Sequence, residues 1–259
     1  MIIDSHFHTL SMLKRGERLP EGLIGIDIGL EPGDYPERLK ALPPSRKIFC
    51  SIASGPWRLD EEDFVSPEED IAQLEKEAEL YLPDAIGECG FDRHWKYGTP
   101  ELQRELFLLQ AELASRLSLP LIIHTRDADS DIEEAFNSSS FRCKAVMHCF
   151  SSGPELCRKA LDKGLYISFA GNVTYKGNQK IRDAAKLVPP DRILVETDSP
   201  YLAPVPMRGR PCNPSCTEYT LDALSDVRGE DREALKSQIE RNLYSFLGHE
   251  ESERKLCLP

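Results

Sequence analysis

The chain has 259 residues, of which 40% are hydrophobic and 29% charged, and its formal net charge is −12. The length predicts one barrel domain over residues 1–259, and no run approaches the roughly 20 apolar residues that span a bilayer. The acidic total argues against a broad basic surface for nucleic acid, because phosphate binding relies on Lys and Arg. With no signal sequence at the N-terminus, we expect a cytoplasmic protein, and a monomer as the default for this fold.

Short apolar runs recur along the chain and are predicted as buried strands, with segments of helical spacing between them. The expected strands, in chain order, are Ile2–Asp4, Leu23–Ile28, Ile48–Ile52, Ala85–Glu88, Leu121–His124, Ala145–His148, Leu165–Phe169 and Ile193–Glu196. The alternation predicts an α/β fold. It favours a (β/α)8 TIM barrel with parallel strands, and a doubly wound open sheet is the alternative.

Three of the intervening helices carry start or stop signals. Ser66-Pro67-Glu68-Glu69 has the pattern of a capping box with proline at the first helical position. Thr99-Pro100 opens a second helix, whose predicted apolar stripe is Leu102, Leu106, Leu109, Leu113 and Leu117. A third stripe, which Gly248 can end, is formed by Leu235, Ile239, Leu243 and Leu247.

Side chains that bind metals stand at the ends of five predicted strands. Asp4-Ser5-His6-Phe7-His8 follows the first apolar run, and alternation along a strand places His6 and His8 on one side, together with Asp4. The other candidates at strand ends are Glu88, His124, His148 and Asp198. The carboxyl ends of parallel strands in a barrel are where chemistry is placed, so these side chains are expected to converge.

Imidazole and carboxylate ligands suit several divalent ions, and a carboxylate can bridge two of them. We expect His6, His8 and Asp198 to hold one ion, His124 and His148 a second, and Glu88 to bridge them. Two ions about 3.5–4 Å apart activate water and polarise the bond under attack. Taken singly, each residue has an ordinary interpretation, such as a core histidine or a turn aspartate, but five coincident strand ends favour the metal.

Two carboxylates near the end of the last strand have further candidate roles. Asp198 is a candidate general base, because a carboxylate bound through one oxygen can take a proton with the other. Glu196 lies on the same face by alternation, where it either orients a ligand from behind or forms a buried salt bridge lower in the barrel. Both alternatives for Glu196 stay open at this stage.

Five segments together resemble the TatD family of metal-dependent deoxyribonucleases, within the amidohydrolase-like barrels. In the family's order across nearly the whole chain, they are Asp4–His8, Gly87–Asp92, Ile122–Ala128, His148–Ser151 and Val195–Pro204. The resemblance implies a (β/α)8 barrel with His6, His8, Glu88, His124, His148 and Asp198 as metal ligands. It also implies hydrolysis of phosphodiesters in DNA, often from a 3′ end, with Mg²⁺, Mn²⁺ or Zn²⁺ as cofactors.

The chain departs from the family pattern where the family commonly contacts substrate. A Gly-Ile-His-Pro-His pattern is common after the third strand, whereas this chain has Ala53-Ser54-Gly55-Pro56-Trp57. The Asn-Glu-Pro that often follows the family's Gly-Arg segment, here Gly209-Arg210, is replaced by Cys212-Asn213-Pro214. The ligands match while these positions differ, so the resemblance supports hydrolysis more strongly than it supports DNA as the substrate.

The expected loops on the ligand side carry candidate substrate contacts. Arg126, Arg208 and Arg210 can grip phosphates through bidentate hydrogen bonds, and Trp57 can stack on a base or cap the open end of the barrel. The leading hypothesis is therefore a hydrolase acting on DNA ends or short oligonucleotides. The alternatives are a metal-dependent hydrolase of an amide, ester or lactone, and a metal-binding scaffold without turnover.

Overall fold

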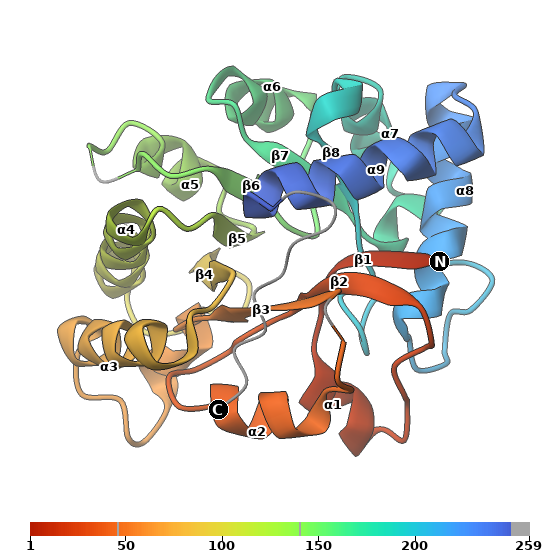
Figure 1. The fold of residues 1–259 in the computed structure, drawn as a ribbon. Coiled ribbons are helices and arrows are strands. Elements are labelled where there is room, and N and C mark those ends of the chain that lie inside the picture. The colour runs from red at the N-terminus through yellow and green to blue at the C-terminus, as the bar shows by residue number, and fades with distance from the viewer. Residues whose placement is uncertain (46, 140, 250–259) are drawn as a thin grey trace.

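The computed structural model describes residues 1–45, 47–139 and 141–249, and its eight parallel strands follow one another around a barrel in sequence order (Figure 1). Their bounds are β1 Ile2–Phe7, β2 Leu23–Asp27, β3 Ile48–Ile52, β4 Ala85–Asp92, β5 Leu121–Arg126, β6 Ala145–Met147, β7 Tyr166–Phe169 and β8 Ile193–Val195. The predicted (β/α)8 barrel is confirmed. Strands β4 and β5 run beyond their predicted ends, so Glu88 and His124 lie inside strands.

Helices cover the outside of the barrel. They are α1 Thr9–Lys14, α2 Tyr35–Ala41, α3 Pro67–Tyr81, α4 Pro100–Leu117, α5 Asp129–Ala135, α6 Pro154–Asp162, α7 Gln179–Ala185, α8 Thr217–Arg228 and α9 Arg232–Leu247. Short 3₁₀ helices are η1 Pro56–Asp60, η2 Gly171–Thr174, η3 Pro190–Arg192 and η4 Pro214–Cys216. None of the helices in the described residues is long and apolar enough to cross a membrane.

Local sequence signals set the helix boundaries. The Ser66 and Thr99 side chains accept hydrogen bonds from the amides of Glu69 and Leu102, which satisfies donors that a helix start leaves open. At the other end of the chain, α9 stops at Gly248, whose φ of 75° is the left-handed conformation that glycine adopts without a Cβ penalty. These three predicted boundaries are confirmed.

The predicted apolar stripe of α4 is partly wrong. Leu106 and Leu113 are buried, but Leu117 is 40% exposed. The buried face instead includes two glutamines, Gln103 and Gln110, both nearly inaccessible to solvent. Their amide groups bond to the backbone at the ends of β3 and β4, which compensates for burying polar atoms.

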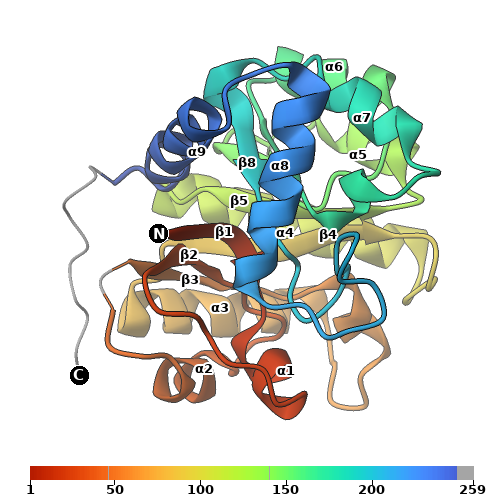
Figure 2. The same ribbon diagram turned by 90° about the vertical axis from the view of Figure 1, so that its right-hand side faces the viewer.

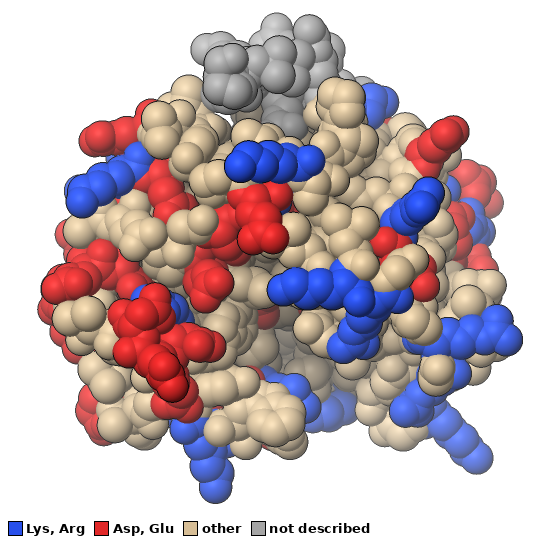
Figure 3. Space-filling view, turned by 90° about the horizontal axis from the view of Figure 1, so that it is seen from below, with Lys and Arg blue, Asp and Glu red and all other residues tan. Residues whose placement is uncertain are grey.

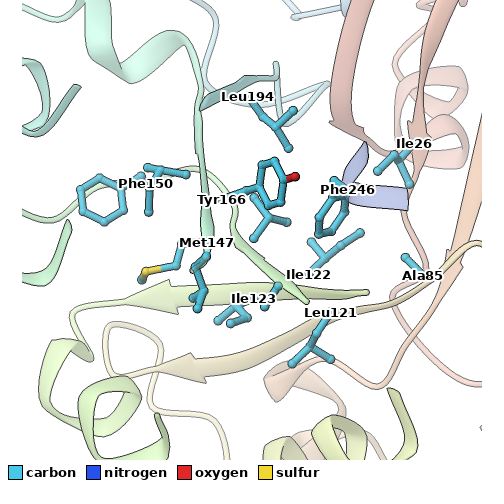
Figure 4. Close-up of a cluster of buried hydrophobic side chains, with 14 of the residues drawn as sticks. Ile26, Ala85, Leu121, Ile122, Ile123, Met147, Phe150, Tyr166, Leu194 and Phe246 are labelled. Atoms are coloured by element: carbon cyan, nitrogen blue, oxygen red, sulfur yellow. The ribbon is translucent and has the colours of Figure 1, made fainter. Parts of the chain in front are cut away.

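Helix α9 packs across the amino-terminal end of the barrel and fills it with Phe246. Figure 4 shows this ring beside Tyr166, Ile122 and Ile26, and the Phe246 and Tyr166 ring centroids are 5.5 Å apart. In Figure 2 the chain begins at the left end of β1, so the strands point to the right, where the loop before α8 lies. One end of the barrel is thus sealed by apolar packing, which leaves the carboxyl end for polar side chains.

Candidate metal centre

Backbone hydrogen bonds close the barrel at its carboxyl end. The Asp198 amide donates to the carbonyl oxygen of His6 at 3.0 Å, and the His8 amide donates to that of Ser199 at 2.9 Å. Beneath these bonds the Asp4 carboxylate accepts from the amide and hydroxyl of Thr197. These contacts hold the segment after β8 against β1, and they place Asp198 beside the two histidines.

Asp4 itself is a structural residue. Its side chain is fully buried, and burial raises the pKa of its carboxyl well above the ordinary value although hydrogen bonds oppose the shift. It lies on the same face of β1 as His6 and His8, as the alternation predicts, but its hydrogen bonds go to Thr197 and the His6 amide. Asp4 therefore joins β1 to the segment after β8.

The side chains of the six predicted ligands converge. His6 Nε2 lies 3.2 Å from His8 Nε2, and Asp198 Oδ1 lies 3.2 Å from His8 Nε2 and 3.7 Å from His6 Nε2. Two imidazole nitrogens and a carboxylate oxygen at these separations form the first of the groups whose donor atoms could hold one metal ion. All three side chains are mostly buried.

A second group lies on the neighbouring strands. His124 Nδ1 and His148 Nε2 are 3.3 Å apart, and each is within 2.9 Å of Glu88 Oε1. The other oxygen of the same carboxylate, Oε2, faces the first group, 3.2 Å from His6 Nε2 and 3.7 Å from His8 Nε2. Glu88 thus presents one oxygen to each group, which is the arrangement a bridging ligand requires.

The electrostatics of Glu88 fit a place for cations. Burial acts to raise its pKa, but the adjacent His148 and His6 and the hydrogen bonds from His124 and His148 bring the pKa well below the ordinary value. The ionised form of this buried carboxylate is thus favoured, and a buried ionised carboxylate is stabilised by positive charge beside it. A divalent ion coordinated by the same atoms meets that need, so the donor set suits a metal.

Glu196 lies behind His148. Its Oε1 is 3.2 Å from His148 Nδ1, the ring nitrogen that faces away from Glu88. The other oxygen, Oε2, is buried without a hydrogen-bond partner among the described residues. The geometry favours the prediction that Glu196 orients a ligand, although a third possible metal-binding group combines Glu196 with His6 and His148.

The four predicted substrate contacts differ in how closely the structure ties them to this centre. Trp57 stands edge-on to His124, with ring centroids 5.9 Å apart, while its indole N–H donates to the Leu30 carbonyl. Arg126 lies over the Trp95 ring and Arg208 over the Tyr175 ring. Arg210 is exposed in the loop before α8, with no ring or ion-pair contact among the described residues.

Several site residues were not predicted from the sequence. Arg15, which follows α1, lies over the ring of Tyr201, and that ring is edge-on to His8. Asp92 Oδ2 lies 3.2 Å from His124 Nε2. Alternation from Glu88 along β4 already places Asp92 on the same face, which was an available signal, whereas the Arg15–Tyr201 contact joins residues far apart in the sequence.

Comparison with known proteins agrees with this geometry. The family model for TatD related DNases matches residues 3–248. YcfH of Escherichia coli K12, named an uncharacterized metal-dependent hydrolase, is 37% identical over 72% of this chain and 69% of its own. TatD of Mycobacterium tuberculosis, with the same description, is 34% identical over 78% of each chain.

Solved structures show the same fold at lower identity. YjjV, a TatD homolog from Escherichia coli, superposes with a TM-score of 0.79 over 95% of this chain and 97% of its own, at 22% identity. A TatD family hydrolase of Entamoeba histolytica gives a TM-score of 0.76 over 95% and 97% of the two chains, at 20% identity. The histidine and carboxylate centre, together with these relatives, identifies the chain as a metal-dependent hydrolase. The chain belongs to the TatD related DNase family.

Proposed function

We propose that this hydrolase is a two-ion phosphodiesterase that acts on DNA ends or short oligonucleotides, as the family's name suggests. The observation that carries the proposal is the position of Glu88, whose two oxygens face two separate groups of ligands. Paired ions suit phosphoryl transfer, because charge on both the attacking and the leaving oxygen must be stabilised.

The two groups of side chains described above would each hold one ion. His6, His8 and Asp198 would hold one ion, His124 and His148 the other, and Glu88 both. Bound Mg²⁺, Mn²⁺ or Zn²⁺ would supply activation of water and neutralisation of phosphoryl charge. Asp198 contributes the base: Oδ1 faces His8, and Oδ2, which has no hydrogen-bond partner in the described part of the chain, can accept the proton of the attacking water.

Arginine and aromatic side chains around the centre favour a phosphate-bearing substrate. Arg15, Arg126 and Arg208 each lie over an aromatic ring, at 4.9, 5.7 and 4.3 Å from the ring centroid. Figure 3 shows Lys and Arg along the lower edge of the view, the side toward which the strands point, while Asp and Glu gather on the left. The net charge of −12 thus coexists with local cations where phosphates would enter.

The altered segment after β3 keeps hydrolysis of a carbonyl substrate as the second candidate. In place of the family's histidines the chain has Trp57, whose ring contacts His124 and adds an apolar wall. An apolar wall near the ligands suits an uncharged ester, lactone or amide better than a polyanion.

The test is release of nucleotides from labelled single-stranded DNA by purified protein, with Mg²⁺, Mn²⁺ or Zn²⁺ added back after chelation. We expect metal-dependent release that Glu88→Ala abolishes, since removing the bridge disrupts both ion sites. Release of equal rate from wild-type and Glu88→Ala protein would identify a contaminating nuclease. Turnover of a lactone, ester or amide with no release from DNA would contradict the nuclease and support the second candidate.

A further inference from the structure

Asp92 is a buried carboxylate that the proposed reaction leaves without a role. It is 2% exposed and lies at the end of β4, four residues beyond Glu88 on the same face of the strand. Its Oδ2 lies 3.2 Å from His124 Nε2. An ionised carboxylate is expensive to bury, so its position beside one histidine and one backbone amide calls for an explanation.

Which nitrogen of His124 can bind an ion depends on which of the two carries the proton. Nδ1 faces Glu88 Oε1 at 2.7 Å and His148 Nε2 at 3.3 Å, in the interior of the centre. Nε2 points the other way, to Asp92. Because a carboxylate only accepts, Asp92 favours Nε2–H as its donor, and with an ion bound beside Glu88 the Nδ1 lone pair would be the ligand atom.

Asp92 is itself held rigidly. The Gln103 side chain of α4 accepts from the Asp92 amide at 3.0 Å and donates to the Asp92 carbonyl at 3.1 Å, so a paired amide clamps the backbone. The second carboxylate oxygen, Oδ1, accepts from the Trp95 amide at 2.8 Å. Only Oδ2 is left for His124, so the direction of that hydrogen bond is fixed by the surrounding structure.

The two ligand groups differ in what lies behind their histidines. His124 and His148 each have a carboxylate behind the nitrogen that faces away from Glu88, namely Asp92 and Glu196. The corresponding atoms of the other pair, Nδ1 of His6 and of His8, are buried without a hydrogen-bond partner among the described residues. Carboxylates behind ligating histidines fix ring orientation and raise ligand basicity.

We propose that Asp92, clamped by Gln103, is a positioning residue that fixes His124 in the Nε2–H tautomer and thereby sets the affinity of the second of the two ion sites. This inference rests on the proposed two-ion centre but not on the identity of the substrate. Loss of Asp92 leaves the Nδ1 lone pair of His124 without a fixed direction, while the His6, His8 and Asp198 group keeps its own contacts.

Two measurements test this role with ions alone, without substrate. In ¹⁵N-histidine NMR spectra of the Zn²⁺-loaded wild-type protein, we expect the His124 ring to show Nε2 protonated and Nδ1 unprotonated. In Mn²⁺ titrations, we expect Asp92→Asn to weaken one of two binding steps by about 10- to 100-fold and to leave the other within about twofold. Gln103→Met, which removes the clamp and keeps the carboxylate, should weaken the same step by a smaller factor.

The matched control is Asp131→Asn, because Asp131 pairs with Arg93 at the barrel rim and contacts none of the six ligands. It should leave both binding steps unchanged. A His124 ring protonated on Nδ1 in the Zn²⁺-loaded protein, or equal Mn²⁺ affinities in wild-type and Asp92→Asn proteins, would overturn the role of Asp92. If the wild-type protein binds two ions but cleaves no DNA, the proposed substrate fails while the role of Asp92 stands.

Discussion

Individual side chains at the carboxyl end of the barrel divide into those that alternation along a strand predicts and those it does not. His6 and His8 are two residues apart in β1, and their Nε2 atoms are neighbours for that reason. Alternation also places Asp92 on the same face of β4 as Glu88, but that position alone does not distinguish a carboxylate that supports a metal centre from an ordinary buried one. The Arg15–Tyr201 contact joins the end of α1 to the segment after β8 and needs the closed barrel.

Arg126 is expected to contribute to substrate binding through its charge. A charge-assisted hydrogen bond to phosphate is worth about 1.5–3 kcal/mol, so Arg126→Ala should lower kcat/KM on an oligonucleotide by about 10- to 100-fold. The effect should appear mainly in KM and should shrink as salt rises. Steady-state kinetics at two ionic strengths measure both quantities.

The control for this substitution is Arg142→Ala. Arg142 is exposed and precedes β6, at the opposite end of the barrel, so its removal changes the net charge equally without touching the centre. If both variants lose the same activity, the effect comes from overall charge, and the assignment of Arg126 to phosphate binding is wrong.

At the scale of elements, apolar periodicity predicts strands well and the faces of helices less well. All eight strands lie where short apolar runs predict them, because nearly all residues of these runs are buried whichever face they point to. The stripe on α4 was misplaced because Gln103 and Gln110 occupy its buried face. Their amide groups form hydrogen bonds with the backbone at strand ends, and a polar residue in the sequence does not by itself indicate such a buried position.

Close packing of β4 against β5 depends on Gly90. Its φ is 152°, and a Cβ there would lie 2.0 Å from the His124 carbonyl oxygen, in backbone that cannot yield locally. We expect Gly90→Ala to lower the free energy of unfolding by about 1–3 kcal/mol or more and to weaken metal binding. Urea denaturation, followed by circular dichroism, measures the first effect.

Gly177→Ala serves as the comparison, because no atom lies within 4 Å of a Cβ added at this exposed position. Its free energy of unfolding should match that of the wild-type protein within about 0.5 kcal/mol. Equal stability of Gly90→Ala and wild-type proteins would mean that the two strands do not approach each other as described.

The amino-terminal end of the barrel is expected to be important for stability but not for chemistry. Phe246 is fully buried there, so Phe246→Ala should lower the free energy of unfolding by about 3–5 kcal/mol. The folded fraction should retain wild-type Mn²⁺ affinity, since the ligands lie at the other end. A large loss of Mn²⁺ affinity in protein that remains folded would show that the two ends are coupled.

For the whole molecule, the sequence allows the fold and the six converging side chains to be predicted because strand ends in a barrel share one face. What joins them into one centre follows from three-dimensional packing. The closing hydrogen bonds between β1 and the segment after β8 involve residues 190 or more positions apart, such as Asp198 and His6. The orientation of Glu88 between the two groups likewise depends on the neighbouring strands.

Ion binding is expected to stabilise the whole fold. The ligands come from strands throughout the chain, so an unfolded chain cannot present them together. At an ion concentration of 100 times Kd, each bound ion adds about 2.7 kcal/mol to the free energy of unfolding. Thermal unfolding after chelation should therefore occur at a lower Tm, and Mn²⁺ should restore it; a Tm insensitive to both would argue against ligands gathered from distant strands.

The most direct test of the two-ion centre is the number of Mn²⁺ ions bound per chain in wild-type protein and three variants, by isothermal titration with elemental analysis. We predict two ions in the wild-type protein. His8→Ala and His124→Ala should each lose one, from different groups, while Glu88→Ala should weaken both because each oxygen serves one ion. One ion in the wild-type protein, or undiminished binding in Glu88→Ala, would contradict the bridging role of Glu88.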